Sequence, residues 1–401
     1  MVPDSVKRFQ EYLRIKSVHP TPDYWGCVDF LVGQAKEIGL EHKVVECVKD
    51  KPVVILTLPG TNPSLKSILL NSHTDVVPVY EEHWNYPPFG AERVLQENGD
   101  HRIYARGAQD MKVTGSMYLE ALREIKNSGK QLVRNVHAMF VPEEELGGKL
   151  GMAQFVKSDE FKALNGGFGL DEGALSFNEY TFYFTRERTV CWTKYTVHGN
   201  VGHGSQLIKD TAVEKLLPIM NTMADFRKQQ VDGLNAMEGN PLINQGHFTS
   251  VNMTMIEGGQ QPNVIPATYS LVVDMHISAD LDANENFKWQ ETLAAEHGAD
   301  LEFINRVTSN VSTVLDDTNP FMNAFKTVCK RQNRIALEAI MPAATDAQYV
   351  RNAGIPAIGV NPMRNHPPLV HDHNEYVNES EFLEGIPFYV DMIQELANIT
   401  E

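Results

Sequence analysis

The sequence has few cysteines, no long apolar run and a shortage of basic residues. Its four cysteines form no C-x-x-C pair, so no disulfide framework is expected, and reduced thiols in a cytosolic protein are the simplest interpretation. No run of about 18 apolar residues is present, which argues against a transmembrane helix. The residues from Met1 to Arg8 lack the apolar core of a signal peptide. We therefore expect a cytoplasmic protein.

Acidic residues outnumber basic residues by 52 to 35, which gives a formal net charge of −17. This balance argues against nucleic acid and against an anionic membrane surface as partners. Hydrophobic residues make up 42% of the 401 residues and charged residues 22%, as in ordinary globular proteins. A chain of this length is expected to form about two to three domains and to bury a core without disulfides.

Strands and helices alternate in the first part of the chain. Residues 53–58 and 67–70 have the aliphatic character of strands, and residues 136–140 alternate between apolar and other side chains. Apolar residues four positions apart predict a helix over residues 111–127. This alternation predicts an α/β domain with a mostly parallel sheet.

The pattern changes near residue 180, where strand-like segments become more frequent. The expected strands are 180–184, 192–197, 250–255 and 269–275, and the expected helices are 211–228 and 284–296. We therefore predict an inserted α+β domain over residues 183–305, between the two parts of the α/β domain, 1–182 and 306–401. The chain closes with an apolar helix in which Pro387 is expected to introduce a kink.

Acidic and histidine residues follow the predicted strands. His73 and Asp75 come after strand 67–70, and open α/β sheets place their sites at the carboxyl ends of strands. Asp75 could orient the imidazole of His73, as ligating histidines usually require. Asp110 precedes the predicted helix and is either a helix cap or a carboxylate able to bridge two cations. Taken singly, each residue also fits an ordinary surface loop.

Three consecutive glutamates, residues 143–145, follow the strand that ends at Pro142. A charged surface turn would explain them. Carboxylates crowded between a buried strand and a Gly-Gly turn nevertheless favour a bound cation. One of them could then hold the metal while its neighbour acts on a bound water. Asp171 and Glu172 follow another apolar strand in the same way.

Two further histidines, His371 and His373, follow a proline-rich loop. Either could be a ligand, and either could be a solvated side chain. Histidine and several carboxylates together suit a catalytic Zn²⁺, which accepts both and keeps one position open. Two such ions that share a carboxylate would form a two-metal hydrolytic site.

Four segments resemble the family of di-zinc aminoacylases, which also includes carboxypeptidases, acetylornithine deacetylases and succinyl-diaminopimelate desuccinylases. They are residues 71–78 (NSHTDVVP), 105–112 (ARGAQDMK), 140–148 (FVPEEELGG) and 170–173 (LDEG). Residues 199–205, 262–268 and 341–346 extend the resemblance over nearly the whole chain, in order. Within the family the sequence is similar to the cytosolic amidohydrolases of N-acyl-L-amino acids, the aminoacylases.

The resemblance implies two zinc ions per subunit, bridged by Asp110. The implied ligands are His73, Asp110 and Glu172 for one ion, and Asp110, Glu145 and His371 for the other. His371 is favoured over His373 by the family pattern of His, two residues, Asn or Asp, and then Glu. Glu144 would be the general base for the attacking water, and Asp75 its helper behind His73.

The inserted residues 183–305 resemble the lid domain of this family, which also forms a homodimer. Two residues of this domain match positions that reach the active site: Asn263, and His203 from the partner subunit. His203 would stabilise the oxyanion. Without the resemblance, a turn histidine between two glycines would be the simpler interpretation of His203.

One position departs from the family pattern. Relatives commonly carry Asp-x-Arg where this sequence has Asp274-Met275-His276, and that Arg recognises the free carboxylate of the substrate. A neutral His is a weaker carboxylate partner than a bidentate Arg. His276 is therefore either a substrate-binding residue or an ordinary strand residue whose contact has moved elsewhere.

The implied activity is zinc-dependent hydrolysis of N-acyl-L-amino acids to a free L-amino acid and a carboxylate. A dipeptidase or carboxypeptidase of the same di-zinc family is the alternative. A binding protein that has lost catalysis would show an incomplete ligand set, whereas all five implied ligands and Glu144 are present.

Overall fold

A computed structural model describes residues 2–309, 311–314, 316 and 318–400. The chain divides into two compact units. Unit 1 comprises Met1–Thr185, Ser312–Glu338 and Thr345–Glu401, and unit 2 comprises Arg186–Val311 and Ala339–Ala344. The sequence analysis did not anticipate that the short segment Ala339–Ala344 would return to unit 2.

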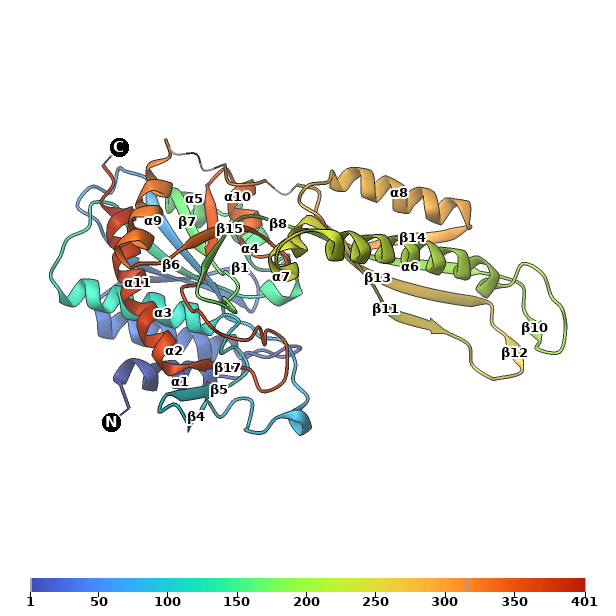
Figure 1. Ribbon diagram of the computed structural model, residues 1–401, viewed down its shortest axis with the longest axis horizontal. Coiled ribbons are helices and arrows are strands. Elements are labelled where there is room, and N and C mark those ends of the chain that lie inside the picture. Colours follow the sequence, from blue (N-terminus) through green and yellow to red (C-terminus); the bar gives the residue numbers. More distant parts are fainter. Residues whose placement is uncertain (1, 310, 315, 317, 401) are drawn as a thin grey trace. The chain divides into compact units, whose positions relative to one another are not determined.

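Unit 1 contains most of the helices and a large sheet (Figure 1). Its helices are α1 (Asp4–Arg14), α2 (Tyr24–Ile38), α3 (Lys112–Asn127), α4 (Met152–Phe155), α5 (Asp159–Ala163), α9 (Pro320–Arg331), α10 (Ala347–Asn352) and α11 (Glu379–Ala397). The strands of its large sheet are β1 (Glu41–Val48), β2 (Lys51–Leu58), β3 (Ser67–His73), β6 (Val136–Val141), β7 (Gly166–Asp171), β8 (Thr181–Glu187), β15 (Ala336–Met341) and β16 (Ala357–Val360). A smaller sheet joins β4 (Glu92–Leu95), β5 (His101–Tyr104) and β17 (Tyr376–Asn378).

The large sheet has the order β1-β2-β6-β3-β7-β16-β8-β15. Its central strands β6, β3, β7 and β16 are parallel, while β1, β2 and β8 pair with their neighbours in antiparallel fashion. The predicted α/β class is therefore confirmed, and antiparallel strands extend the parallel centre of the sheet on both sides.

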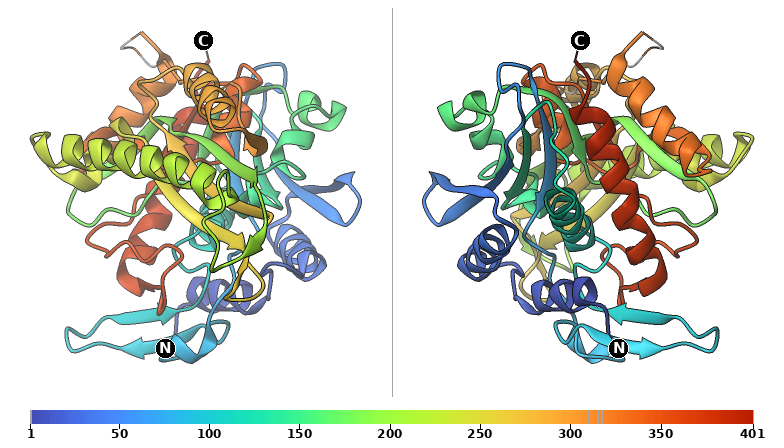
Figure 2. Two further views of the ribbon diagram at one scale, coloured as in Figure 1. Left: turned by 90° about the vertical axis from the view of Figure 1, so that its right-hand side faces the viewer. Right: turned by 90° about the vertical axis from the view of Figure 1, so that its left-hand side faces the viewer.

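Helices cover both faces of this sheet (Figure 2). Alternate residues of β2 enter different clusters: Val54 and Leu56 pack with residues of α1, α2, α3 and α11, and Val53 and Ile55 pack with residues of α4 and α5. Because both of its faces are buried, β2 has a continuous apolar run over residues 52–56, as is typical of strands between helical layers.

The parallel register brings separate segments of sequence to one edge of the sheet. His73, the last residue of β3, lies opposite Val141, the last residue of β6. Leu70 of β3 lies opposite Leu170 of β7, one residue before that strand ends. The loops after β3, β6 and β7 therefore leave the sheet side by side, which explains how residues 73, 144 and 172 can meet.

Three helices, α3, α11 and α6 (Ala212–Ala236), differ in detail from expectation. The helix predicted over 111–127 is α3, Lys112–Asn127, and the described helix α11 continues through Pro387 from Glu379 to Ala397. The inserted helix expected over 211–228 extends further, to Ala236. Its start is well specified because Thr211 and Glu214 form a capping box.

Unit 2 consists of a four-stranded antiparallel sheet with helices against one face (Figure 1). The strand order is β11 (Ser250–Gly258), β13 (Thr268–Ile277), β9 (Thr189–His198) and β14 (Ala299–Arg306). The helices are α6 (Ala212–Ala236), α7 (Pro241–Asn244) and α8 (Ala283–Glu296), and a small ribbon joins β10 (Gly202–His203) to β12 (Val264–Ile265). Apolar residues of α6 and α8 cover one face of the four-stranded sheet.

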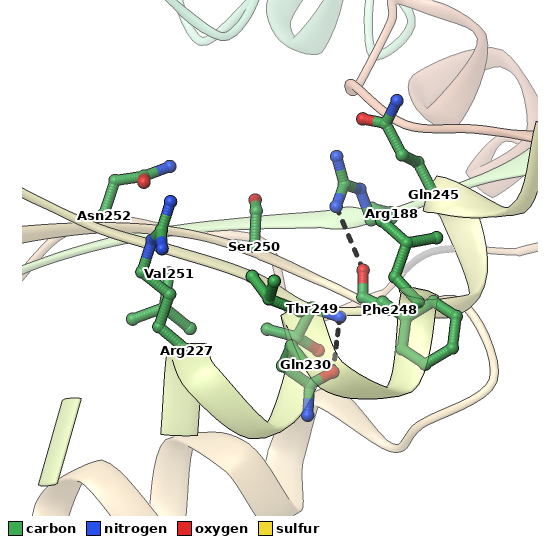
Figure 3. Close-up of a pocket in the computed structure, with 11 residues that line it drawn as sticks. Arg188, Arg227, Gln230, Gln245, Phe248, Thr249, Ser250, Val251 and Asn252 are labelled. Atoms are coloured by element: carbon green, nitrogen blue, oxygen red, sulfur yellow. Dashed lines mark hydrogen bonds between the residues drawn. The ribbon is translucent and has the colours of Figure 1, made fainter. Parts of the chain in front are cut away.

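A pocket within unit 2 lies beside the start of β11 and is lined by both arginine and apolar side chains (Figure 3). The buried Arg188 donates hydrogen bonds to the carbonyl oxygens of Phe248 (3.0 Å) and Pro342 (2.5 Å). Arg188 therefore ties the segment before β11 to the short returning segment Ala339–Ala344. Arg227 of α6 lines the same pocket and is exposed.

No helix in the described part of the chain combines the length and the apolar character that a membrane span requires.

Candidate metal centre

His73 forms the floor of a cluster of acidic side chains in unit 1. Its side chain is 1% exposed, and its Nδ1–H donates to the backbone carbonyl of Asp75 at 2.9 Å. In a neutral imidazole this contact leaves the Nε2 lone pair facing the acids, as a metal ligand requires. The orienting group predicted at position 75 is thus the backbone carbonyl rather than the carboxylate.

Asp110 occupies the middle of the cluster. Its Oδ1 lies 2.9 Å from Nε2 of His73, and its Oδ2 lies 3.2 Å from Nε2 of His371. The helix-cap interpretation is wrong, because the N-cap residue of α3 is Met111 and has no side-chain cap. A carboxylate with one imidazole on each side has the arrangement of a bridge between two sites.

The three consecutive glutamates have three different environments. Glu143 is buried, and its carboxylate accepts hydrogen bonds from Tyr24 (2.8 Å) and Lys51. Glu145 points to His371, with Oε2 at 3.0 Å from Nε2. Glu144 lies between them, 3.9 Å from Nε2 of His73, which is too far for a hydrogen bond. The run of charge is therefore not a solvated turn.

Glu172 closes the cluster from the end of β7. Its Oε2 lies 3.8 Å from Nε2 of His73, and its side chain is 12% exposed, compared with 13% for Glu144. The side chain of His73 is thus excluded from solvent, while the carboxylates of Glu144 and Glu172 remain partly accessible. A small molecule could reach them.

The pKa values of these acids are displaced by crowding. Burial, followed by the charge of Glu172, raises the pKa of Glu144 well above its usual range. Burial and the charge of Asp110 raise the pKa values of Glu145 and Glu172. Burial opposes ionisation of Asp110 as well, but hydrogen bonds from His371 and His73 hold its pKa below the usual range. Simultaneous ionisation of these carboxylates is therefore unfavourable without a cation beside them.

The two candidate histidines near the end of the chain have separate positions. His371 lies against Asp110 and Glu145, with half of its side chain exposed. The ring of His373 lies 5.0 Å from that of His83 and 6.2 Å from that of Tyr80. The structure brings His371, and not His373, to the acids.

The donor set fits divalent metal ions. The possible ligand atoms of His73, Glu144 and Glu172 lie within 4.8 Å of one another, and so do those of His73, Asp110 and Glu145. Oε1 of Glu145 is buried without a hydrogen-bond partner in the described part of the chain, so one of its lone pairs is available. Imidazole and carboxylate groups crowded in this way match a two-ion hydrolytic site.

Supporting residues surround the cluster, and the sequence analysis assigned no role to two of them, His19 and Glu375. The carboxylate of Asp75 is 0% exposed and accepts a hydrogen bond from Nε2 of His19 at 2.8 Å. Burial works against the charge of His19, but the bond to Asp75 raises its pKa. Sequence gives little signal for His19, because a lone histidine 56 residues before Asp75 has no fixed spacing to the motif.

Glu375 supports the loop that carries Asp110. Its buried carboxylate pairs with Arg106 at 2.6 Å and accepts backbone hydrogen bonds from Gln109 (2.5 Å) and Asp110 (3.3 Å). The family pattern around residue 371 contained this glutamate, but its function could not be read from spacing. Its place in the structure shows that it fixes the backbone on which Asp110 is carried.

The remaining candidate residues belong to unit 2. His203 and Asn263 come together where β10 pairs with β12, with His203 opposite Val264, and both are exposed. Nδ1 of His203 lies 2.8 Å from the hydroxyl of Ser205. His276 lies on β13, on the sheet face opposite α6 and α8, and its Nε2 is 3.4 Å from Asp274.

Comparisons with known proteins show the family to which the chain belongs. The model of the peptidase family M20/M25/M40 matches residues 69–395. Aminoacylase-1A of Rattus norvegicus is 44% identical over 397 residues, and Aminoacylase-1 of Sus scrofa is 44% identical over 398 residues. Each alignment covers 98% of this chain and 96% of the relative.

A solved structure shares the fold. The M20 family metallo-carboxypeptidase Sso-CP2 from Sulfolobus solfataricus superposes with a TM-score of 0.79 at 16% identity, covering 99% of this chain and 100% of that one. The family match spans all five implied metal ligands and Glu144, which lie between residues 69 and 395. The chain belongs to the peptidase family M20/M25/M40.

Proposed function

We propose that this chain is a zinc-dependent amidohydrolase that cleaves N-acyl-L-amino acids to a free L-amino acid and a carboxylate. The observation that carries the proposal is the cluster around Asp110, in which His73, His371, Glu145 and Glu172 converge beside the carboxylate of Glu144. Two relatives that match almost the whole chain are named aminoacylases, which supports the substrate class.

Two zinc ions would be held by the side chains at this cluster. The proposed ligands are His73, Asp110 and Glu172 for one ion, and Asp110, Glu145 and His371 for the other. When bound, zinc supplies Lewis acidity, which polarises an amide carbonyl and makes water more acidic. Bound cations would offset the burial and the neighbouring negative charges, of Glu172 and Asp110 respectively, that raise the pKa values of Glu144 and Glu172.

Glu144 is the proposed general base. Its carboxylate accepts a proton from the attacking water and donates it to the departing amine nitrogen. General acid–base catalysis of this kind typically increases the reaction rate by about 10²–10⁴-fold. Glu144 suits the role because it has neither the Lys51 partner of Glu143 nor the His371 partner of Glu145, and because its side chain remains 13% exposed.

Unit 2 is the proposed lid and dimerisation domain, as the resemblance implies for residues 183–305. In this proposal His203 of one subunit donates a hydrogen bond to the oxyanion formed in the other, and Asn263 binds substrate. Strand β11 supports a homodimer, because it is an edge strand and exposes Met255 and Ile256 by 51% and 56%. If no partner covered them, exposed apolar side chains on an edge strand would favour aggregation.

The cellular location proposed for this enzyme is the cytoplasm. All four cysteines are free, and Cys47 is exposed, as expected for a protein kept in a reducing compartment.

The decisive test uses Glu144→Gln in the intact protein. This variant should bind as much zinc as the wild type, measured by metal analysis, and its kcat for an N-acetyl amino acid should fall by about 10²–10⁴-fold. Glu143→Gln is the matched control, because Gln can still accept from Tyr24 and Lys51, and it should keep most of the activity.

Substrate choice separates this function from its alternative. Wild-type enzyme should hydrolyse N-acetyl amino acids faster than dipeptides of the same side chain. The reverse order would identify a dipeptidase or carboxypeptidase, and near-wild-type activity of Glu144→Gln would overturn the assignment of the base.

A further inference from the structure

The loop after β3 is held by an N-terminal segment far away in sequence. Residues 17–19 run alongside residues 74–76, with a parallel bridge between Val18 and Val76. The amide of Val76 donates to the carbonyl of Ser17 (2.9 Å), and the amide of His19 donates to the carbonyl of Val76 (3.2 Å). The side chain of His19 is thereby delivered next to Asp75.

The segment 17–19 is itself firmly anchored. The hydroxyl of Ser17 donates to the carbonyl of Thr74 at 2.5 Å. Just upstream, the buried ammonium of Lys112 donates to the carbonyl oxygens of Tyr12 and Ile15, at the end of α1. The ring of His19 is therefore attached to a rigid backbone and not to a mobile terminus.

Asp75 connects this segment to the acidic cluster. Its buried carboxylate accepts Nε2–H of His19 at 2.8 Å and the backbone amides of Glu144 and Glu145 at 3.2 Å each. Two of the three donors thus belong to the proposed base and to a proposed ligand, and the third is the imidazole of His19. The orientation of this carboxylate and the position of the turn at residues 144–145 depend on each other.

We infer that His19 is a positioning residue of the hydrolytic site. Its imidazole fixes the carboxylate of Asp75, and that carboxylate holds the backbone of Glu144 and Glu145 in place. The inference rests on the proposed function for the roles of these two glutamates. Groups that orient metal ligands from behind typically contribute about 10–100-fold to metal affinity or activity.

The experiment compares two substitutions at position 19 in the full-length enzyme loaded with zinc. His19→Leu keeps the bulk but removes the donor, and His19→Gln keeps an N–H donor at similar reach. His19→Leu should lower kcat by about 10–100-fold and weaken zinc binding, measured by chelator competition, by a similar factor, with KM nearly unchanged. His19→Gln should recover most of both losses.

His137→Leu is the matched control. His137 is also a buried histidine of unit 1, but it lies within β6 and contacts the hydroxyl of Thr57. Removal of the His137 imidazole should leave zinc affinity and kcat unchanged. If His19→Leu does not fold, His19→Asn replaces it in the comparison with His19→Gln. The side chain of Asn is one methylene shorter than that of Gln, so its N–H donor falls short of Asp75.

Two results would overturn the inference: wild-type kcat and zinc affinity in folded His19→Leu, or equal losses in the Leu and Gln variants. The second would mean that the ring packs and does not position Asp75. If wild-type enzyme cleaves no N-acyl amino acid, the proposed function fails, while zinc affinity across the same variants still tests the role of His19.

Discussion

At the scale of single residues, neighbours in this chain have sharply different environments. Glu143 pairs with Lys51 and accepts a hydrogen bond from Tyr24, Glu144 lies 3.9 Å from His73 without a hydrogen bond to it, and Glu145 contacts His371. The strand–turn geometry after β6 points three adjacent carboxylates in three directions. A sequence motif of three identical letters therefore carries three separate roles.

His371 and His373 provide a matched pair for testing which side chain binds metal. His371→Ala should lose one zinc ion per subunit, because its imidazole lies within 3.2 Å of Asp110 and Glu145. His373→Ala should keep both ions, because its ring packs on His83 and Tyr80. Metal analysis after dialysis makes the comparison, and loss of zinc from the His373 variant alone would reverse the assignment.

The residues at strand ends could be predicted from sequence, and the residues behind them could not. His73, Asp110 and Glu172 stand at the ends of apolar runs or before a helix, so parallel-sheet geometry brings them together. The side chain of His19 reaches the site through a hydrogen bond to Asp75, 56 residues away, and that of Glu375 through the backbone amide of Gln109, 266 residues away. No local pattern marks such contacts, because they depend on the path of the folded chain.

At the scale of elements, unit 2 depends on a hydrogen-bonded crosslink beside β11. Arg188 donates to the carbonyl of Phe248 (Figure 3) and to that of Pro342, and its burial lowers the pKa of its guanidinium to about 10. Ala339–Ala344 was not predicted to belong to this unit, because a six-residue stretch with no period of its own carries no domain signal. Arg188 is one of the groups that hold it there.

Arg188→Gln should therefore lower the stability of the protein. The loss should be about 1–3 kcal/mol, since two buried carbonyl oxygens lose a charged donor. Arg227→Gln is the control from the same pocket, and because Arg227 is exposed its effect should stay within about 0.5 kcal/mol. Urea unfolding of both variants measures the difference, and equal effects would contradict the crosslink.

Strand β6 contains an acid-sensitive group. Burial lowers the pKa of His137 to about 4 in the folded protein. The same side chain in the unfolded chain is protonated at about pH 6.5, so protonation favours unfolding between these two values. Stability contributed by the neutral ring is complete above pH 6.5 and is lost as the pH falls toward 4. His137→Leu should remove this part of the decline.

The measurement is urea unfolding of wild type and His137→Leu at pH 7 and pH 5. The wild type should lose on the order of 2 kcal/mol more than the variant between these values. Parallel curves for the two proteins would show that His137 is protonated in the folded state. Other acids titrate in both proteins, so their contributions cancel in the comparison.

At the scale of the whole molecule, the proposed assembly predicts shared active sites. The proposal places His203 of one subunit beside the cluster of the other, so His203→Ala and Glu144→Gln homodimers should both be nearly inactive. In a mixed dimer, one site combines an intact Glu144 with an intact His203. Its activity should reappear when the two variants exchange subunits.

Subunit exchange is followed by mass spectrometry, and hydrolysis of an N-acetyl amino acid is measured in the same samples. Mixing either variant with itself is the control and should restore nothing. Proven exchange without recovered activity would mean that His203 acts within its own subunit or has only a structural role.

The position of β16 in the large sheet has a consequence for how the protein is made. This strand separates β7 from β8 and pairs with both, yet residues 357–360 are synthesised long after either of them. While the ribosome is still extending the chain, β7 has one neighbour and an open edge, and such edges recruit other chains. Most of unit 2, Arg186–Val311, is by then a continuous stretch that is free to fold. The nascent chain thus carries an unfinished sheet until β16 has been synthesised, which happens after most of unit 2 has been made.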